Sequence, residues 1–180
     1  MGIFDIFKKK GPDYDPADLK IDDLRPGFLF EYDLKSWVIR EEYKYDWGDH
    51  YFTKEFKIDS GTDMAFLHID NNDNLFITLT RKVRIRSIRE DIPDKIKEKD
   101  RPPKKLEYQG KTFYLEGTNP GYYNQDPSSN NWAELISWDY YDKSGEHTIA
   151  IEQWGENEFE ASYGDVVKDF EISNIIPGNE

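Results

Sequence analysis

Apolar and polar side chains alternate along most of this chain from Phe28 onward, and this pattern constrains the fold more than any other feature. In a β-strand, successive side chains point to opposite faces, so an alternating segment has one apolar face. The alternating segments are rich in aromatic and β-branched residues, and clusters of Gly, Asn and Asp separate them. No segment beyond Leu24 has helical periodicity. The sequence therefore predicts an all-β fold of antiparallel strands.

Short polar clusters mark the turns between the predicted strands. A long hairpin is predicted around Asp46–Asp49, because alternating segments flank this cluster on both sides. Further turns are expected at Asp33–Lys35, Ser60–Asp63 and Asp70–Asn74. These turns predict a meander in which each strand pairs with the next one along the chain.

The order of segments in the first half repeats in the second. Phe30–Tyr32 resembles Leu106–Tyr108 at an offset of about 76 residues, and the later segments correspond at an offset of about 84. This order predicts an internal duplication that forms two related antiparallel β units, each a small barrel or a sandwich-like meander. The alternative is that any two meanders of this composition look alike.

The pattern divides the chain into four parts. Residues 1–23 form an N-terminal tail in which Asp15–Leu19 resembles the capped start of a short helical segment. Residues 24–88 form the first β unit, and residues 106–180 form the second. Residues 89–105 mix charges with three prolines, so we expect an exposed linker without a regular element.

The closing strands of the two units differ in charge. Lys82–Ile88 is expected to be a strand with Lys82, Arg84 and Arg86 on one face, whereas acids fill the corresponding place in Asp169–Ile172. Such a basic face is suited to a small anion or to the acidic strand of the other unit, and a solvated face is the simpler interpretation.

The net charge and the missing residue types exclude several functions. The chain has 37 acidic and 24 basic residues, a net charge of −13 that belongs almost entirely to residues 106–180. We expect no nucleic-acid partner, because phosphates require a basic face. The absence of Cys excludes disulfides, thiolate metal sites and thiol nucleophiles.

Other motifs of catalysis and metal binding fail on inspection. The cluster Asp70–Asn74 resembles a calcium loop, but Leu75 stands where the loop needs Gly and Arg81 where it needs Glu. The three histidines have no zinc-site spacing, and no nucleophile elbow, phosphate-binding loop or dinucleotide fingerprint occurs. We therefore expect no metal, no cofactor and no enzymatic activity.

One constellation combines aromatic residues with carboxylates. Tyr and Trp faces attract ammonium and guanidinium groups, and flanking carboxylates add charge and hydrogen bonds. The pattern predicts a binding or scaffold module for a cationic small molecule, such as a polyamine, or for a basic peptide. The same rings are suited to sugar binding, as in a carbohydrate-active or carbohydrate-binding protein, and to ordinary packing within a sheet. The candidate residues are Tyr43, Tyr45, Trp47, Asp49, Trp132, Glu134, Trp138 and Tyr140.

The N-terminus suggests a further hypothesis. Ile3, Phe4, Ile6 and Phe7 precede three lysines, an amphipathic pattern suited to peripheral contact with a membrane surface. Under this hypothesis, the protein is an adaptor that associates with membranes through its N-terminal segment. Because this apolar stretch is too short for a signal peptide or a spanning helix, we expect a cytoplasmic protein.

Several segments resemble a known bacterial family. The family catalogued as domain of unknown function 4178 has similar segments, which in this chain are Leu24–Gly27, Glu31-Tyr32, Trp37-Val38, Glu41–Asp49 and Phe56–Asp59. The Glu-Tyr-x-Tyr-Asp-Trp-Gly-Asp hairpin is the most specific part. The resemblance implies a soluble bacterial β protein of unassigned function, and it carries over no catalytic residues.

Overall fold

The first half of the chain folds as a meander of five antiparallel strands. The computed structural model describes residues 14–15 and 17–178. Each of the five strands pairs with the next, and the turns lie where the sequence predicts them. The strands are β1 (Leu29–Tyr32), β2 (Lys35–Asp46), β3 (Phe52–Asp59), β4 (Met64–Asp70) and β5 (Phe76–Val83).

The second half has the same order of strands, with a short strand, a long strand and three more. A 3-10 turn, η2 (Asp169–Glu171), and a final strand, β11 (Ser173–Ile176), follow them, and β11 pairs with β1. This shared order is compatible with the predicted duplication, which stays a prediction. The strands are β6 (Lys105–Tyr108), β7 (Lys111–Asn124), β8 (Ala133–Asp142), β9 (His147–Gly155) and β10 (Glu158–Val167).

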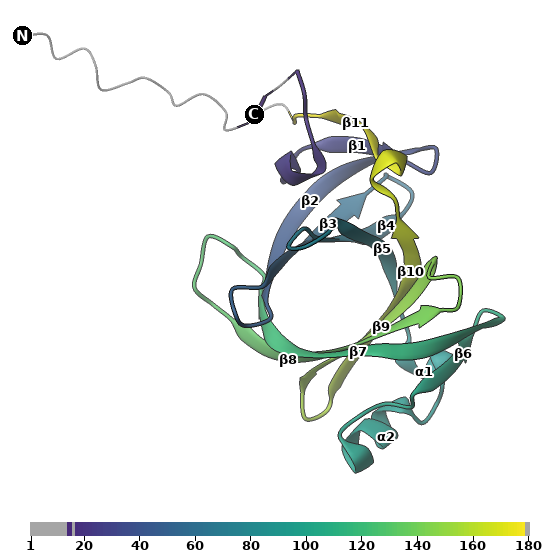
Figure 1. The fold of residues 1–180 in the computed structure, drawn as a ribbon. Helices are drawn as coiled ribbons and strands as arrows, with labels where there is room; N and C mark the ends of the chain where they lie inside the picture. The colour runs from purple at the N-terminus through teal and green to yellow at the C-terminus, as the bar shows by residue number, and fades with distance from the viewer. Residues whose placement is uncertain (1–13, 16, 179–180) are drawn as a thin grey trace, which may run out of the picture.

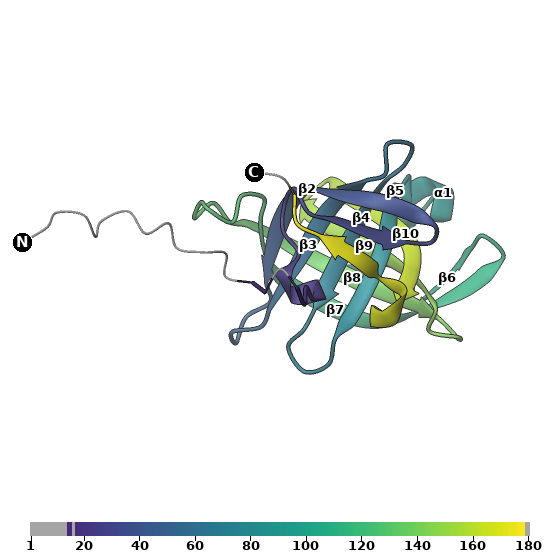
Figure 2. The ribbon, with the colours of Figure 1, turned by 90° about the horizontal axis from the view of Figure 1, so that it is seen from above.

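The two meanders form one continuous sheet. β5 pairs with β10, and the ends of β2 and β7 pair over Lys44↔Asn124, Tyr45↔Tyr123 and Asp46↔Tyr122. These two pairings join β2–β5 and β7–β10 into a ring, seen along its axis in Figure 1 and from above in Figure 2. β1 and β11 lie outside the ring on one side, and β6 lies outside it on the opposite side (Figure 1).

The first of two hydrophobic cores packs on the outer face of the ring, beneath β1 and β11. On β4, Ala65, Leu67 and Ile69 are buried in this core, and the alternate side chains face the interior of the ring. Full burial of one such Leu or Ile side chain contributes about 1.5–3 kcal/mol. The first core contains Leu24, Phe28, Phe30, Trp37, Ile39, Phe56, Ile58, Ala65, Leu67, Ile69, Ile77, Leu79, Val167 and Ile172.

The second core packs on the opposite outer face, beneath β6 and two helices, α1 (Ile85–Ile88) and α2 (Ile92–Lys99). Its strand residues again alternate with side chains that face the interior of the ring. This core contains Ile88, Ile92, Ile96, Leu106, Phe113, Trp138, Tyr140, Ile149, Ile151 and Ala161.

Irregularities in the two long strands let each of them serve both a core and the ring interior. The register of β2 against β3 shifts between Ile39 and Glu41, and that of β7 against β8 shifts between Leu115 and Gly117. One extra residue in a strand reverses the face on which the following side chains lie. In β2, Trp37 therefore packs in the first core, whereas Tyr43 faces the interior.

The two helices correct two predictions about residues 82–105. β5 ends at Val83 and α1 follows, so Lys82, Arg84 and Arg86 do not share a strand face. The expected linker contains α2, which buries Ile92 and Ile96 in the second core. Ile88, Ile92 and Ile96 recur every four residues, a helical spacing that the many charges around them conceal.

The other end segments also differ from expectation. Asp169–Glu171 forms the 3-10 turn η2 in place of an acidic strand. The helical segment predicted near Asp15 is not confirmed, and the only helical turn described before β1 is η1 (Ile21–Asp23). Ile3–Phe7 lies outside the described residues, so the membrane hypothesis stays a prediction. Within the part of the chain that the structure describes, no helix is long and apolar enough to cross a membrane.

A candidate binding pocket inside the strand ring

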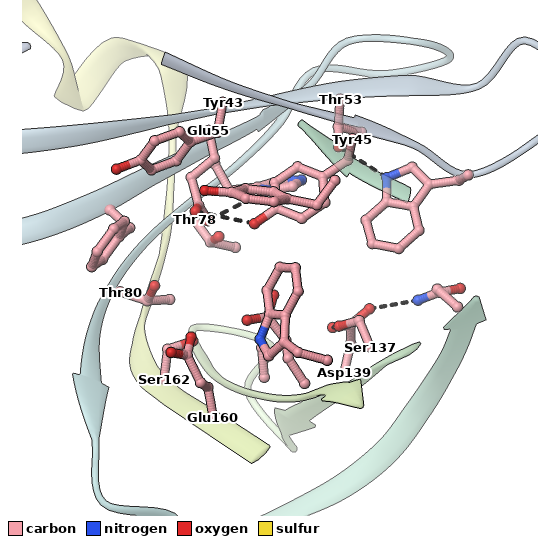
Figure 3. A pocket seen from close by; sticks show the side chains of 18 of the residues that line it. Tyr43, Tyr45, Thr53, Glu55, Thr78, Thr80, Ser137, Asp139, Glu160 and Ser162 are labelled. Carbon is pink, nitrogen blue, oxygen red and sulfur yellow. Dashed lines mark hydrogen bonds and ion pairs between the residues drawn. The ribbon is translucent and has the colours of Figure 1, made fainter. Parts of the chain in front are cut away.

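The interior of the ring contains a large pocket. Its volume is about 1250 Å³, and all eight strands of the ring contribute residues to its lining. Typical small-molecule sites measure about 300–1,000 Å³. Figure 3 shows Tyr43, Tyr45 and Glu55 on one side of this pocket and Ser137, Asp139 and Glu160 on the opposite side. The space therefore lies between the two halves of the chain and is large enough for a small organic ligand.

Five neighbouring rings form an aromatic wall along this pocket. The ring of Tyr45 stacks on Trp47 with 5.3 Å between centroids and 6° between planes, and it lies 5.2 Å from the ring of Tyr123. The ring centroids of Trp154 and Tyr123 lie 4.9 Å apart, with 76° between the ring planes. The aromatic wall is defined here as Tyr43, Tyr45, Trp47, Tyr123 and Trp154.

Local contacts hold Trp47 in this wall. Its indole Nε1 donates a hydrogen bond of 2.9 Å to Thr53 Oγ1. Opposite it, Gly121 of β7 leaves no room for a side chain, because a Cβ atom there would lie 2.5 Å from Cε3 of Trp47. A glycine on β7 thus allows the indole to pack directly on the backbone of the other half.

Carboxylates outnumber the cations of the pocket. Seven Asp and Glu residues line it, against two lysines and His68. Both lysines already have partners, since Lys82 binds Glu160 and Lys57 Nζ lies 2.7 Å from Glu41. The lining carboxylates are Asp49, Glu55, Asp70, Asp139, Glu152, Glu158 and Glu160.

Glu55 and Asp139 are held by hydrogen bonds from their neighbours. The hydroxyl of Tyr45 donates to Glu55 over 3.2 Å, and Nδ1 of His68 lies 3.7 Å from the same carboxylate. Asp139 accepts a bond of 2.9 Å from the Ser137 hydroxyl and one of 2.6 Å from the Asn119 amide. Burial nevertheless raises the pKa of Asp139.

Glu152 is the least compensated of these acids. It stands directly opposite Glu160 in the pairing of β9 with β10, and no side chain or backbone group in the described residues donates a hydrogen bond to it. Burial raises the pKa of Glu152 to about 8, with further contributions from Glu55, Glu160 and Asp139 that Lys82 partly offsets. The carboxyl group is therefore mostly protonated at neutral pH.

Burial also keeps the hydroxyl of Tyr45 protonated, so that it remains a hydrogen-bond donor. Burial, together with the charges of Glu55 and Glu152, raises the pKa of Tyr45 well above its ordinary value. Its hydroxyl stays protonated and can donate to Glu55 at any physiological pH.

Among the described residues, no group of three or more His, Asp or Glu side chains is arranged to hold a metal ion.

Comparison with known proteins identifies the family. Residues 25–169 match the domain of unknown function (DUF4178). The chain belongs to this family. An uncharacterized protein of Aquifex aeolicus (strain VF5) is 25% identical over 154 residues, which cover 86% of this chain and 83% of the relative. No solved structure matches the chain. The resemblance of the Glu42–Asp49 hairpin is thus confirmed, and the comparisons assign no activity.

Half of the predicted site residues line the pocket of this DUF4178 chain. Tyr43, Tyr45, Trp47 and Asp49, all from the β2–β3 hairpin, lie in its lining. The hairpin carries both the family resemblance and one side of the pocket. Its aromatic and acidic side chains are therefore brought together as the sequence predicts.

The predicted residues of the second half lie elsewhere. Trp138 and Tyr140 are buried in the second core, where the Tyr140 hydroxyl donates to the Pro103 carbonyl over 2.8 Å. Trp132 Nε1 donates to Asn130 over 3.2 Å, and neither Trp132 nor Glu134 lines the pocket. On β8, the residues that line the pocket are Ala133, Ser137, Asp139 and Tyr141, which alternate with the core residues Trp138 and Tyr140 at the C-terminal end of the strand.

Sequence reasoning missed three acids that line the pocket in this DUF4178 member. Glu55, Asp139 and Glu152 were not predicted site residues, although each directly adjoins at least one buried apolar or aromatic residue. On β9, Glu152 follows Ile151, which is buried in the second core. A signal was available in these alternate positions, because they carry charge on strands whose other face is core.

Proposed function

We propose that the pocket binds an organic cation that carries amine groups, such as a polyamine, and does not transform it. The observation that carries this proposal is the excess of carboxylates around the cavity, where Glu55, Asp139 and Glu152 have no lysine or arginine partner in the described residues. Buried carboxylates destabilise a protein unless a counter-charge compensates them. A cationic ligand supplies that charge.

The aromatic wall supports the same class of ligand. Tyr and Trp faces attract alkylammonium groups, with about 0.5–2 kcal/mol per contact depending on desolvation. The methylene segments of an alkylamine gain by leaving water against the same rings. Tyr43, Tyr45 and Glu55 lie together in Figure 3, but the rings of Tyr43 and Tyr45 are only 5% and 3% exposed. The half-buried rings of Trp47, Tyr123 and Trp154 are therefore the ones that a ligand can contact.

The two halves contribute corresponding residues to the pocket, which supports the proposed duplication. Positions about 84 residues apart both line it, as Thr53 and Ser137 do, and Glu55 and Asp139. A pocket between two copies of one meander explains why acids reach it from both sides. We include the duplication and a cytoplasmic location in this proposal.

Titration with spermidine at low and moderate salt tests the proposal, with tryptophan fluorescence as the readout. We expect a saturable change that weakens as salt screens the carboxylates. Trp154→Phe should reduce this change, and the variant breaks no hydrogen bond, because Nε1 of Trp154 has no partner among the described residues. Trp132→Phe is the matched control, since Trp132 lies outside the pocket lining and the change should persist.

Other ligand classes give different outcomes in the same experiment. If a Lys-rich peptide binds and spermidine does not, the ligand is a basic peptide and not a small cation. A neutral oligosaccharide that binds without salt dependence would favour the carbohydrate hypothesis, because a neutral ligand gains little from carboxylate charge. Absence of any salt-sensitive change with spermidine contradicts the proposed function.

A further inference from the structure

We propose that an ammonium group of the ligand binds between Glu152, Glu55 and Asp139 and displaces the proton of Glu152, so that ligand binding and proton release are linked. This inference rests on the proposed function. In the free protein the proton is on the Glu152 carboxyl oxygen. In the complex that oxygen is a carboxylate paired with the ligand's R–NH₃⁺ group, and one proton passes to solvent. No covalent bond of the ligand changes.

A comparison of corresponding positions in the two halves locates this ammonium site. On β3 and β4, Glu55 has the imidazole of His68 as its neighbour, with 3.7 Å between Nδ1 and the carboxylate. On β9, the position 84 residues after His68 is occupied by Glu152, which pairs across from Ser137, whereas Ala150 lies across from Asp139. The first half thus supplies its own basic partner, and the second half has an acid in the place of that base.

The nearest lysine does not neutralise Glu152. Lys82 lies close enough to favour its ionised form, but the lysine ammonium is bound to Glu160, the residue directly opposite Glu152 in the sheet. The Lys82–Glu160 pair also demonstrates that an alkylammonium group fits within this part of the pocket. A second ammonium, from the ligand, would give Glu152 the partner that Glu160 already has.

Burial and neighbouring charges explain why the proton is present before the ligand binds. Together they raise the pKa of Glu152 to about 8, so at pH 7 roughly 0.9 of the molecules hold the proton. The charged and titratable groups that interact with Glu152, or line the pocket beside its neighbours, come from seven strands of the ring: Tyr45, Glu55, His68, Lys82, Tyr123, Asp139 and Glu160.

The linkage fixes the sign of the pH dependence. Below about pH 8 the ligand must displace a proton, so affinity should rise by up to about tenfold per pH unit from pH 6 and level off above pH 8. The ligand's amines stay protonated over this range, because alkylamines ordinarily titrate near pH 10. His68 lies 3.7 Å from Glu55, so a variant of His68 serves as a control.

Isothermal titration calorimetry with spermidine at pH 7, in two buffers of different ionisation enthalpy, tests the inference. The wild-type protein should release roughly 0.9 of a proton per ligand bound at this site. Glu152→Gln should release fewer than about 0.2 and lose most of the rise in affinity between pH 6 and 8. His68→Gln should keep the release. Glu160→Gln should lower it, because the Lys82 ammonium is then free to pair with Glu152.

The outcomes separate this inference from the function on which it rests. If spermidine binds but Glu152→Gln releases as many protons as the wild type, the inference is overturned and the cation site stands. If His68→Gln abolishes the release, the proton comes from elsewhere and the inference is overturned. If no amine binds the wild type, both proposals fail.

A second measurement decides the matter if Glu152→Gln does not fold. Carbon-13 NMR of glutamate-labelled protein at pH 7 reports the protonation of each carboxyl group. Addition of spermidine should move one Glu resonance from the protonated to the ionised range and no other Glu by a comparable amount. A spectrum in which no Glu resonance changes its protonation state on saturation with spermidine overturns the inference.

Discussion

The outer and inner faces of the same strands have opposite chemistry. On β5, Ile77 and Leu79 are buried in the first core, whereas Thr78 and Thr80, their immediate neighbours, line the pocket. The outer faces bury large apolar side chains in two cores, and the inner faces carry acids, hydroxyls and rings around a cavity. Burial of apolar side chains in the two outer cores therefore stabilises the fold. The inner faces can carry destabilising charges, because neither core depends on them.

The largest effect is expected from a pair of neighbours on β5. Ile77→Ala should lower the free energy of unfolding by about 2–5 kcal/mol, because it opens a cavity in the first core. Thr78→Ala, on the pocket face, should lower it by less than about 1 kcal/mol. Urea denaturation measures both. Equal losses for the two variants would break the comparison between the faces.

A smaller effect is expected where the inner face is tightly packed. Gly121→Ala should lower the free energy of unfolding by about 1–3 kcal/mol, because the new methyl group overlaps the indole of Trp47. It should also shift the fluorescence of Trp47. Gly155→Ala is the control, since nothing described lies within 4 Å of its added Cβ. Unchanged stability and fluorescence in Gly121→Ala would show that Trp47 does not pack there.

The acidic inner face should make the free energy of unfolding depend on pH. The folded-state pKa of Glu152 is about 8, above the ordinary value of 4.5, so the folded chain holds this proton after the unfolded chain has lost it. Stability should therefore fall as pH rises from about 5 to 8. Glu152→Gln should be more stable than the wild type by at least about 1–2 kcal/mol at pH 8, and by less than about 1 kcal/mol at pH 5. Thermal unfolding at the two pH values measures this, and a lower stability of the variant at pH 8 would contradict it.

The smallest effect is expected from an ion pair remote from the pocket interior. Hydrogen bonds from Arg81 lower the pKa of Asp63 to about 2, with help from Lys35. This contribution is present above about pH 4 and is lost as pH falls toward 2. Asp63→Asn should cost about 0–1 kcal/mol at pH 7, since the pair is solvent-screened. Chemical denaturation at pH 7 and 2.5 measures it. Asp18→Asn, in a more exposed pair, is the control, and a larger loss at pH 2.5 than at pH 7 would contradict the assignment.

Local patterns predicted most strands and one side of the pocket. Alternation and turn residues located the β2–β3 hairpin, and with it Tyr43, Tyr45 and Trp47, because strand and turn preferences act over a few residues. They could not predict the closure of the ring, in which Tyr45 pairs with Tyr123 almost eighty residues away. That contact depends on tertiary packing.

The sequence analysis could not predict which face of each strand lies toward the pocket and which toward a core. Trp138 and Tyr140 alternate with Asp139, and the pattern alone does not tell which set faces a ligand and which a core. The register shift near Arg40 makes this harder, because it reverses the faces within β2. The helix α2 was missed for a related reason, since its two buried isoleucines are surrounded by charged residues.

The five tryptophans offer the most direct test of the central claim that the pocket binds an organic cation. Their indole N–H signals can be followed by nitrogen-15 NMR while spermidine is added. The signals of Trp47 and Trp154, which line the pocket, should shift and saturate together, whereas those of Trp37 and Trp138 in the cores and of Trp132 outside the lining should stay nearly unchanged. Shifts confined to Trp132, or no shift of Trp47 and Trp154 at saturating spermidine, would contradict the account.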